Sequence, residues 1–211
     1  RAALAGVAAE VTWGKEPQLR VTAGRAGLNL EDVYPRLLES ASVRSVLRDF
    51  GSPSGQLQVN SLSLLGPLKD PSRWIFQLRA ELEHLTVPSV LYPGRLQILR
   101  GSVAASENDL TWSGVQASLL DSSAVTSGRL NGLRSGPRSL DLTADGVVGP
   151  KTTDWAEQQA SLATPLLARR PITVSGGHLR WTEKAGAFEG KLAFEKGPTL
   201  TVDLERTKEQ V

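Results

Sequence analysis

The sequence contains no cysteine, no methionine and only two histidines among its 211 residues. Without cysteine, the chain has no disulfide, no thiol nucleophile and no thiolate ligand for a metal. Neither His84 nor His178 has a second metal ligand close by in the sequence. We therefore expect both imidazoles to be solvated or hydrogen-bonded, with no metal and no cofactor.

Long apolar runs and an excess of charge of one sign are also missing. Apolar runs last only a few residues, against about 20 for a transmembrane helix. Lys and Arg number 24 and Asp and Glu number 22, a formal net charge of +2. This balance gives no electrostatic reason to expect a nucleic-acid partner. Hydrophobic residues at 40% and charged residues at 22% are typical of a globular chain that buries a core.

The strongest pattern that is present is the alternation of apolar and polar residues. Trp74, Phe76 and Leu78 occupy even positions, and Gln77 and Arg79 lie between or beside them. A period of two puts the two sets on opposite faces of a β-sheet. The same pattern recurs at 140–142, 172–174, 179–181, 188–194 and 200–204, and more weakly at 4–13, 19–23, 57–65, 96–103, 110–112, 115–119 and 124–130.

Local details of the pattern predict turns and bulges. The apolar parity switches near Asn60-Ser61 and near Leu99, and a β-bulge at each point would restore the facing. Lys196-Gly197-Pro198 separates two alternating runs and predicts a hairpin. Gly176-Gly177 likewise lies between 172–174 and 179–181, which we interpret as a pair of strands.

About a dozen short strands with one apolar face indicate a mainly β (α+β) fold with a mostly antiparallel sheet, because parallel βαβ strands would be apolar on both faces. We expect one domain over 1–211. Its apolar face must be covered by a second sheet, covered by helices, or left partly open for an apolar ligand. The pattern alone does not choose among these three arrangements.

Only two segments, at about 30–50 and 153–168, have the 3.6-residue periodicity of an amphipathic helix. Pro35 suits the first turn of the first helix, and Asn29 could cap a short turn before it. The spacing of Asp154 and Glu157 is that of an acidic variant of a capping box at the start of the second. Both segments are short beside the number of strands. They are expected to be lids or plugs over the sheet, or else ordinary core helices of an α+β fold.

Two segments resemble catalytic or phosphate-binding motifs, but neither has the residues that the motif requires. Positions 51–55 have proline where a nucleophile elbow needs serine, and 186–191 lacks the length and the Ser or Thr of a phosphate loop. The carboxylates are scattered over polar strand faces, where neither burial nor a close neighbour would raise a pKa for acid catalysis. We therefore predict that the protein is not an enzyme and has no catalytic residues.

The candidate binding site consists instead of large residues on the apolar face of the sheet. The simpler interpretation of large residues such as Trp74, Trp112 and Trp181 is that they pack in the protein core. The alternative is that they line a groove for acyl chains. The candidate groove-lining residues are Trp74, Phe76, Leu78, Leu96, Ile98, Trp112, Leu140, Leu142, Trp181, Phe188, Leu192, Phe194, Leu200 and Val202.

The order of segments carries a family resemblance. Leu-Asn-Leu-Glu-Asp-Val-Tyr at 28–34 leads into the first helix, and is followed by Gly-Gln-Leu-Gln-Val-Asn-Ser-Leu-Ser-Leu at 55–64 and Gly-Pro-Leu-Lys-Asp-Pro-Ser-Arg-Trp-Ile-Phe at 66–76. The second helix leads to Arg-Pro-Ile at 170–172 and a strand ending Leu-Arg-Trp at 179–181. Over roughly 19–204 the chain resembles the AsmA-like family of bacterial envelope proteins.

The resemblance implies a curled, taco-like β-groove with an apolar concave face, in the periplasmic body of a protein anchored in the inner membrane. It implies that this segment binds or conducts phospholipid acyl chains, supporting lipid transport to the outer membrane and outer-membrane biogenesis. The absence of methionine and the start at Arg1 lead us to expect a segment of a longer protein whose anchor lies elsewhere. The alternative function is a non-catalytic structural or interaction module that assists outer-membrane protein assembly.

Overall fold

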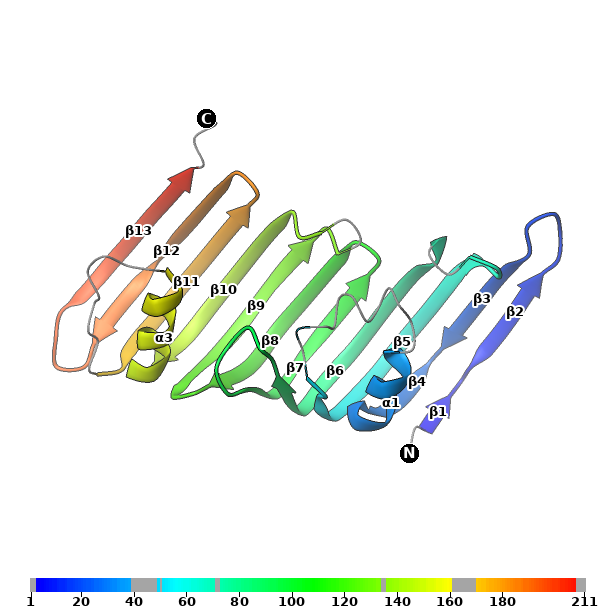
Figure 1. The fold of residues 1–211 in the computed structure, drawn as a ribbon, viewed down its shortest axis with the longest axis horizontal. Coiled ribbons are helices and arrows are strands. Elements are labelled where there is room, and N and C mark those ends of the chain that lie inside the picture. Colours follow the sequence, from blue (N-terminus) through cyan, green and yellow to red (C-terminus); the bar gives the residue numbers. More distant parts are fainter. Residues whose placement is uncertain are drawn as a thin grey trace.

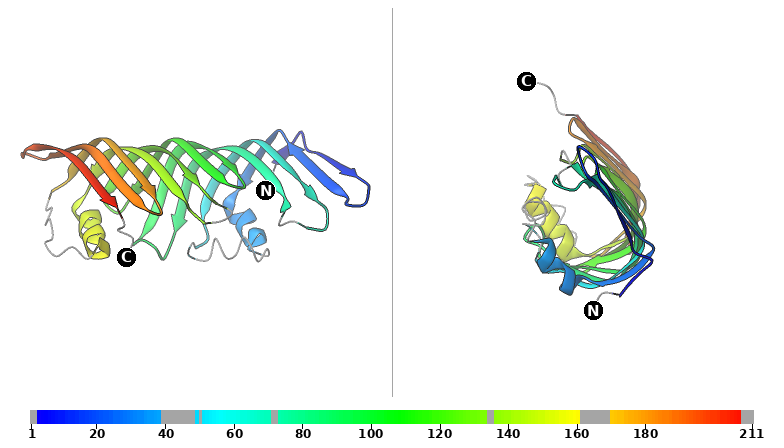
Figure 2. Two further views of the ribbon diagram at one scale, coloured as in Figure 1. Left: turned by 90° about the horizontal axis from the view of Figure 1, so that it is seen from above. Right: turned by 90° about the vertical axis from the view of Figure 1, so that its right-hand side faces the viewer.

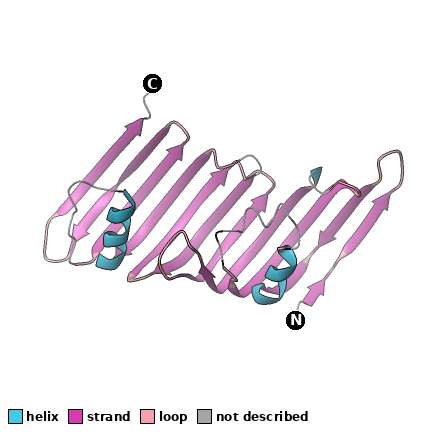
Figure 3. Ribbon diagram, in the orientation of Figure 1, coloured by secondary structure: helices cyan, strands magenta, loops and turns pink. Residues whose placement is uncertain are grey.

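The computed structural model describes residues 3–38, 49, 51–70, 73–133, 136–160 and 170–207. Strands account for 67% of the described residues and form one open, curled antiparallel sheet, and two helices lie within the described ranges (Figure 3). The predicted mainly β fold with a curled antiparallel sheet is therefore confirmed.

The strands follow one another along the sheet almost in chain order (Figure 1). They are β1 (Ala3–Ala5), β2 (Ala8–Thr12), β3 (Gln18–Ala23), β4 (Arg25–Asn29), β5 (Ser54–Pro67), β6 (Ile75–Pro88), β7 (Arg95–Ser106), β8 (Asp109–Leu119), β9 (Ser122–Asn131), β10 (Ser139–Val148), β11 (Ile172–Thr182), β12 (Ala185–Phe194) and β13 (Thr199–Thr207). Near the N-terminus β3 and β4 pair with successive stretches of β5, and β2 pairs only with β3.

Helix α1 (Leu30–Leu37) follows β4, and α3 (Pro150–Ala160) follows β10. Both lie within the concave side of the curl, along the same long edge of the sheet (Figure 2). We call this the helix edge, and the opposite long edge, where β5, β7, β9 and β11 end, the hairpin edge. The residues 39–48 and 161–168 of the two predicted helical ranges lie outside the described part of the chain.

Bulges bend the strands, because the extra residue interrupts the ladder and increases the local twist. The pairing shifts between Val59 and Ser61 and between Ile98 and Arg100, where bulges were predicted. A further shift lies beside Gly55, whose φ of +114° suits glycine and whose added Cβ would lie 2.4 Å from the carbonyl oxygen of His84. These bends make the long strands wrap around the concave side.

Three strand predictions were wrong in their boundaries. The run at 4–13 is two strands, broken at Gly6 with a φ of +66°, and β4 was not predicted. Gly176-Gly177 is not a turn, because β11 continues through it as one bulged strand. The Gly176 N–H donates to Asp145 Oδ1 at 2.6 Å on β10, a contact that local alternation cannot reveal. Trp74 lies just before β6 rather than within it.

The structure changes the predicted caps of both helices. The Glu31 N–H donates to Asn29 Oδ1 at 3.2 Å, so Asn29 caps α1 itself rather than a separate turn before it. Pro35, predicted in the first turn, lies further inside α1. Helix α3 begins at Pro150, and Asp154 is therefore inside it and is not its cap. The first turn of α3 is capped instead by Asp121, which lies in the turn between β8 and β9.

Candidate functional site

Cross-strand pairing gathers the apolar side chains on one face of the sheet. Leu142 on β10 pairs with Leu179 on β11, and Leu179 pairs with Phe188 on β12. On the other face, His178 pairs with Glu189. The apolar side chains are mostly half-buried and the polar ones mostly exposed. The concave side that carries the helices is therefore the apolar side, and we call it the groove.

The strand pairing puts the predicted groove-lining residues of the strands on this face, and Trp74, just before β6, lies over Gly66 of β5. Trp74 lies in the turn before β6, half-buried, and its indole N–H donates to the Pro67 carbonyl at 2.7 Å. Leu200 shares the face but is exposed, because β13 is the last strand of the described sheet.

The N-terminal part of the groove, formed by β3–β6, is packed. Ala26, Val59 and Ala80 on three neighbouring strands are buried, with 3% of Val59 and 2% of Ala80 exposed. Leu28, Leu57, Leu62, Leu78 and Val103 pack around them. Helix α1 contacts β4 and β5 and buries Tyr34. This part of the groove is filled by the protein's own side chains.

The C-terminal part, formed by β7–β13, contains an apolar cavity of about 410 Å³. Its floor consists of small residues on adjacent strands, which include Ala117, Ala124, Ala144 and Gly146. Larger side chains flank them. The full lining is Leu96, Ala117, Ser118, Leu119, Ser122, Ser123, Ala124, Ala144, Gly146, Val147, Val148, Val174 and Phe188. The depth of the cavity therefore comes from side chains that are absent or short.

Trp112 lies across another small residue of the same face. An added Cβ at Gly128 would lie 2.6 Å from the Trp112 ring, so the indole covers the backbone of β9. The indole N–H donates to Thr126 Oγ1 at 3.2 Å, which satisfies its only polar atom. A half-buried tryptophan with its donor bonded presents a mainly apolar surface to the groove.

Helix α3 is anchored at the rim of the cavity by Asp121, in the turn between β8 and β9. The carboxylate accepts the backbone N–H groups of Lys151 at 2.9 Å and Thr152 at 3.2 Å. Burial alone would raise the pKa of Asp121, but these hydrogen bonds outweigh it and lower the pKa below its ordinary value. An added Cβ at Gly149 would lie 2.2 Å from the Asp121 carboxyl carbon, so glycine permits this close approach.

A larger cavity of about 570 Å³ lies on the opposite face of the sheet. Its lining mixes Leu99, Val125 and Val147 with polar Gln97, Gln116, Ser118 and Asp145. The cavity of the groove has only serine hydroxyls and backbone as its polar lining. Because acyl chains offer no hydrogen-bonding groups, the groove fits them better than the larger cavity does.

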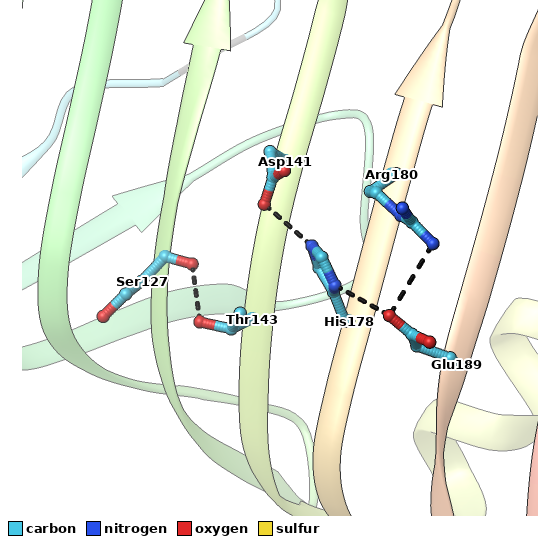
Figure 4. Close-up of polar contacts among 6 residues, drawn as sticks. All are labelled: Ser127, Asp141, Thr143, His178, Arg180 and Glu189. Atoms are coloured by element: carbon cyan, nitrogen blue, oxygen red, sulfur yellow. Dashed lines mark hydrogen bonds and ion pairs between the residues drawn. The ribbon is translucent and has the colours of Figure 1, made fainter.

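His178 forms an ionic cluster on the polar face (Figure 4). Its Nε2 lies 2.9 Å from Asp141 Oδ1 on β10, and its Nδ1 lies 3.0 Å from Glu189 Oε1 on β12. The prediction that His178 is hydrogen-bonded is confirmed by this geometry. The hydrogen bond to Asp141 and then that to Glu189 raise the pKa of His178 above 6.5, against a smaller opposing effect of burial. Protonated His178 thus ties β10, β11 and β12 together.

The cluster predicts a pH-dependent stability. A raised pKa in the folded state means that the stabilisation by His178 is complete below pH 6.5 and is lost as the pH rises through the raised pKa. We expect His178→Gln to lower the melting temperature more at pH 6 than at pH 8.5. The double variant Asp141→Asn/Glu189→Gln should lose the same pH dependence. Equal destabilisation by His178→Gln at both pH values would contradict this account.

Within the described ranges, no group of three or more His, Asp or Glu side chains is arranged to hold a metal ion. No helix in the same ranges is long and apolar enough to cross a membrane. Comparison with known proteins identifies no relative: no family model matches the chain, and searches of curated proteins and of solved structures find no significant match.

The sequence interpretation named the large residues of the groove but missed its small ones. Ala117 and Ala124 lie at apolar-face positions of strands that were predicted, so alternation could have identified them. Gly146 and Ala144 lie in a strand whose predicted extent ended at 142. A search for small residues at alternate positions of adjacent strands would have located the cavity.

Proposed function

We propose that this segment binds the acyl chains of phospholipids in the C-terminal part of the groove and conducts them along its apolar face. The observation that supports the proposal is an apolar cavity of about 410 Å³ that faces the concave side of an open sheet. A molecule of liquid water takes up about 30 Å³, and we take a methylene group to be of similar size. The cavity therefore has the size of one acyl chain of ordinary length.

The chemistry of the lining suits this ligand. An acyl chain gains about 0.8 kcal/mol for each methylene removed from water. It needs no directional contact, and so it can slide along apolar side chains without breaking hydrogen bonds. The cross-strand row of Leu142, Leu179, Phe188 and Leu204 extends the apolar surface beyond the cavity to the last strand. A path of this kind favours transfer over catalysis, and we propose a non-enzymatic function.

The cellular setting follows from the AsmA-like resemblance. We propose a periplasmic location in the cell envelope, a parent protein anchored in the inner membrane outside this segment, and a role in lipid transport to the outer membrane. A second candidate function is a structural or interaction module for outer-membrane protein assembly. The packed N-terminal part of the groove, with Val59 and Ala80 buried, favours this alternative.

Native mass spectrometry of the chain purified from bacterial cells tests the proposal. We expect phospholipid adducts that survive gentle desolvation, and we expect the delipidated chain to take up lipid again from vesicles. The test variant is Ala124→Phe, in which the larger side chain should fill the floor of the cavity and reduce the lipid adducts. Protein that carries no lipid and takes up none would favour the structural module.

A further inference from the structure

The tryptophans are unevenly distributed over the molecule. Trp13 follows β2, Trp74 precedes β6, Trp112 lies near the start of β8 and Trp181 near the end of β11. These four positions are at or near the hairpin edge of the sheet, whereas the fifth tryptophan, Trp155, lies in α3 at the helix edge. Indole rings have an apolar body and one polar N–H, and they concentrate at boundaries between lipid and water.

One corner of this edge exposes large apolar side chains. Trp13 is 77% exposed, Leu68 39% and Ile75 49%. Leu65 pairs directly with Ile75, and both are exposed on the face of the sheet opposite the groove. We call Trp13, Leu65, Leu68 and Ile75 the Trp13 corner. A tryptophan as exposed as Trp13 contributes little to folding through burial.

The two loops of the corner are held together. The Leu68 N–H donates to the Pro17 carbonyl at 2.8 Å, and Arg73 Nη1 donates to Glu16 Oε1 at 2.7 Å. The β2–β3 hairpin and the β5–β6 turn are therefore neighbours at the hairpin edge (Figure 1). Lys15 and Lys69, in the same two loops, are exposed, and the Glu16 carboxylate next to Lys15 is engaged by Arg73.

We propose that the Trp13 corner docks on a lipid surface. Apolar side chains flanked by lysine match the two layers of a membrane boundary, with acyl chains below and anionic phosphate above. Trp74, beside the corner, bonds through its indole to Pro67 at the end of β5. The corner would thus bring one rim of the groove against a membrane. This surface is separate from the cavity, so docking does not depend on lipid inside the groove.

Vesicle flotation of the 211-residue chain tests the docking. The probes are vesicles of phosphatidylcholine alone and of phosphatidylcholine mixed with phosphatidylglycerol. We expect binding to the mixed vesicles, weakened by salt because of Lys15 and Lys69. We expect Trp13→Ser/Leu68→Ser to reduce binding about tenfold, because each side chain would lose its burial in lipid.

The matched control is Val90→Ser/Leu91→Ser, which removes two side chains that are 83% and 57% exposed at the helix edge. Brominated lipid should quench the fluorescence of the wild type more than that of Trp13→Phe. Absence of vesicle binding by the wild type would overturn the proposal. Binding by Trp13→Ser/Leu68→Ser equal to that of the wild type would overturn it too. Dimerisation that the Trp13 variant abolishes, without vesicle binding, would instead assign the corner to a second copy of the chain.

Discussion

Val59→Asp is expected to unfold the protein. Val59 is 3% exposed and packs with Ala26 and Ala80 in the N-terminal part of the groove. Among the described residues no cation shares this apolar cluster, so the new carboxylate would be buried without a partner. Such burial costs several kcal/mol even after its pKa shifts. This is a large fraction of the ~5–15 kcal/mol by which a domain of ordinary stability is folded.

Circular dichroism and thermal melting measure the effect. The expected result for Val59→Asp is loss of the cooperative transition, or a melting temperature lower by well over about 10 °C. Ser61→Asp is the matched control, since Ser61 is exposed on the polar face of the same strand and pairs with Arg79. A Val59→Asp protein that melts like the control would show that this part of the groove is open to water.

Alternation of residues predicted most of the sheet because burial acts on each side chain locally. Phe188 and Leu192 had to share a face whatever their partners, since a strand has a period of two. The bulge near Asn60-Ser61 was visible for the same reason: the apolar parity switched there, and the pairing shifts between Val59 and Ser61. Short stretches of sequence therefore largely determine which face of the sheet each side chain occupies and where the strands bend.

The errors concern contacts between distant residues. Asp121 lies 30 positions before Lys151, and its carboxylate rather than that of Asp154 caps α3. Gly176-Gly177 has the composition of a turn, but pairing with β10 on one side and β12 on the other keeps the chain extended. Local propensity was overridden in both places by tertiary contacts, which a single sequence does not display.

The groove itself was only partly predictable. Large residues such as Phe188 and Trp112 stood out by alternation, but whether they pack together or leave space depends on the residues opposite them. At Val59 the facing residue is Ala80 and the surrounding leucines fill the gap. At Ala117 the facing residue is Ala124 and the gap remains as the cavity. That difference arises from three-dimensional packing, and it separates the two parts of the groove.

Leu192→Asp, the same type of substitution in the C-terminal part, is expected to have a different result. Leu192 lies on the apolar face of β12, pairs with Val174 of the cavity lining and with the exposed Leu200, and is itself half-buried. In the absence of lipid the new carboxylate can reach water through the open groove. The cost of folding should therefore be small beside that of Val59→Asp, whereas a charge beside an acyl chain should reduce lipid retention by about tenfold or more.

Melting temperature and bound phospholipid, measured on the same purified samples, distinguish the possibilities. Thr201→Asp is the matched control, because Thr201 is exposed on the polar face of β13 and pairs with Lys191. Folded Leu192→Asp without lipid, beside a control that retains lipid, is the expected outcome. Unfolded Leu192→Asp together with a wild type free of lipid would mean that the whole concave face is a packed core. In that case the structural module would be the better account, and the cavity a packing defect rather than a path.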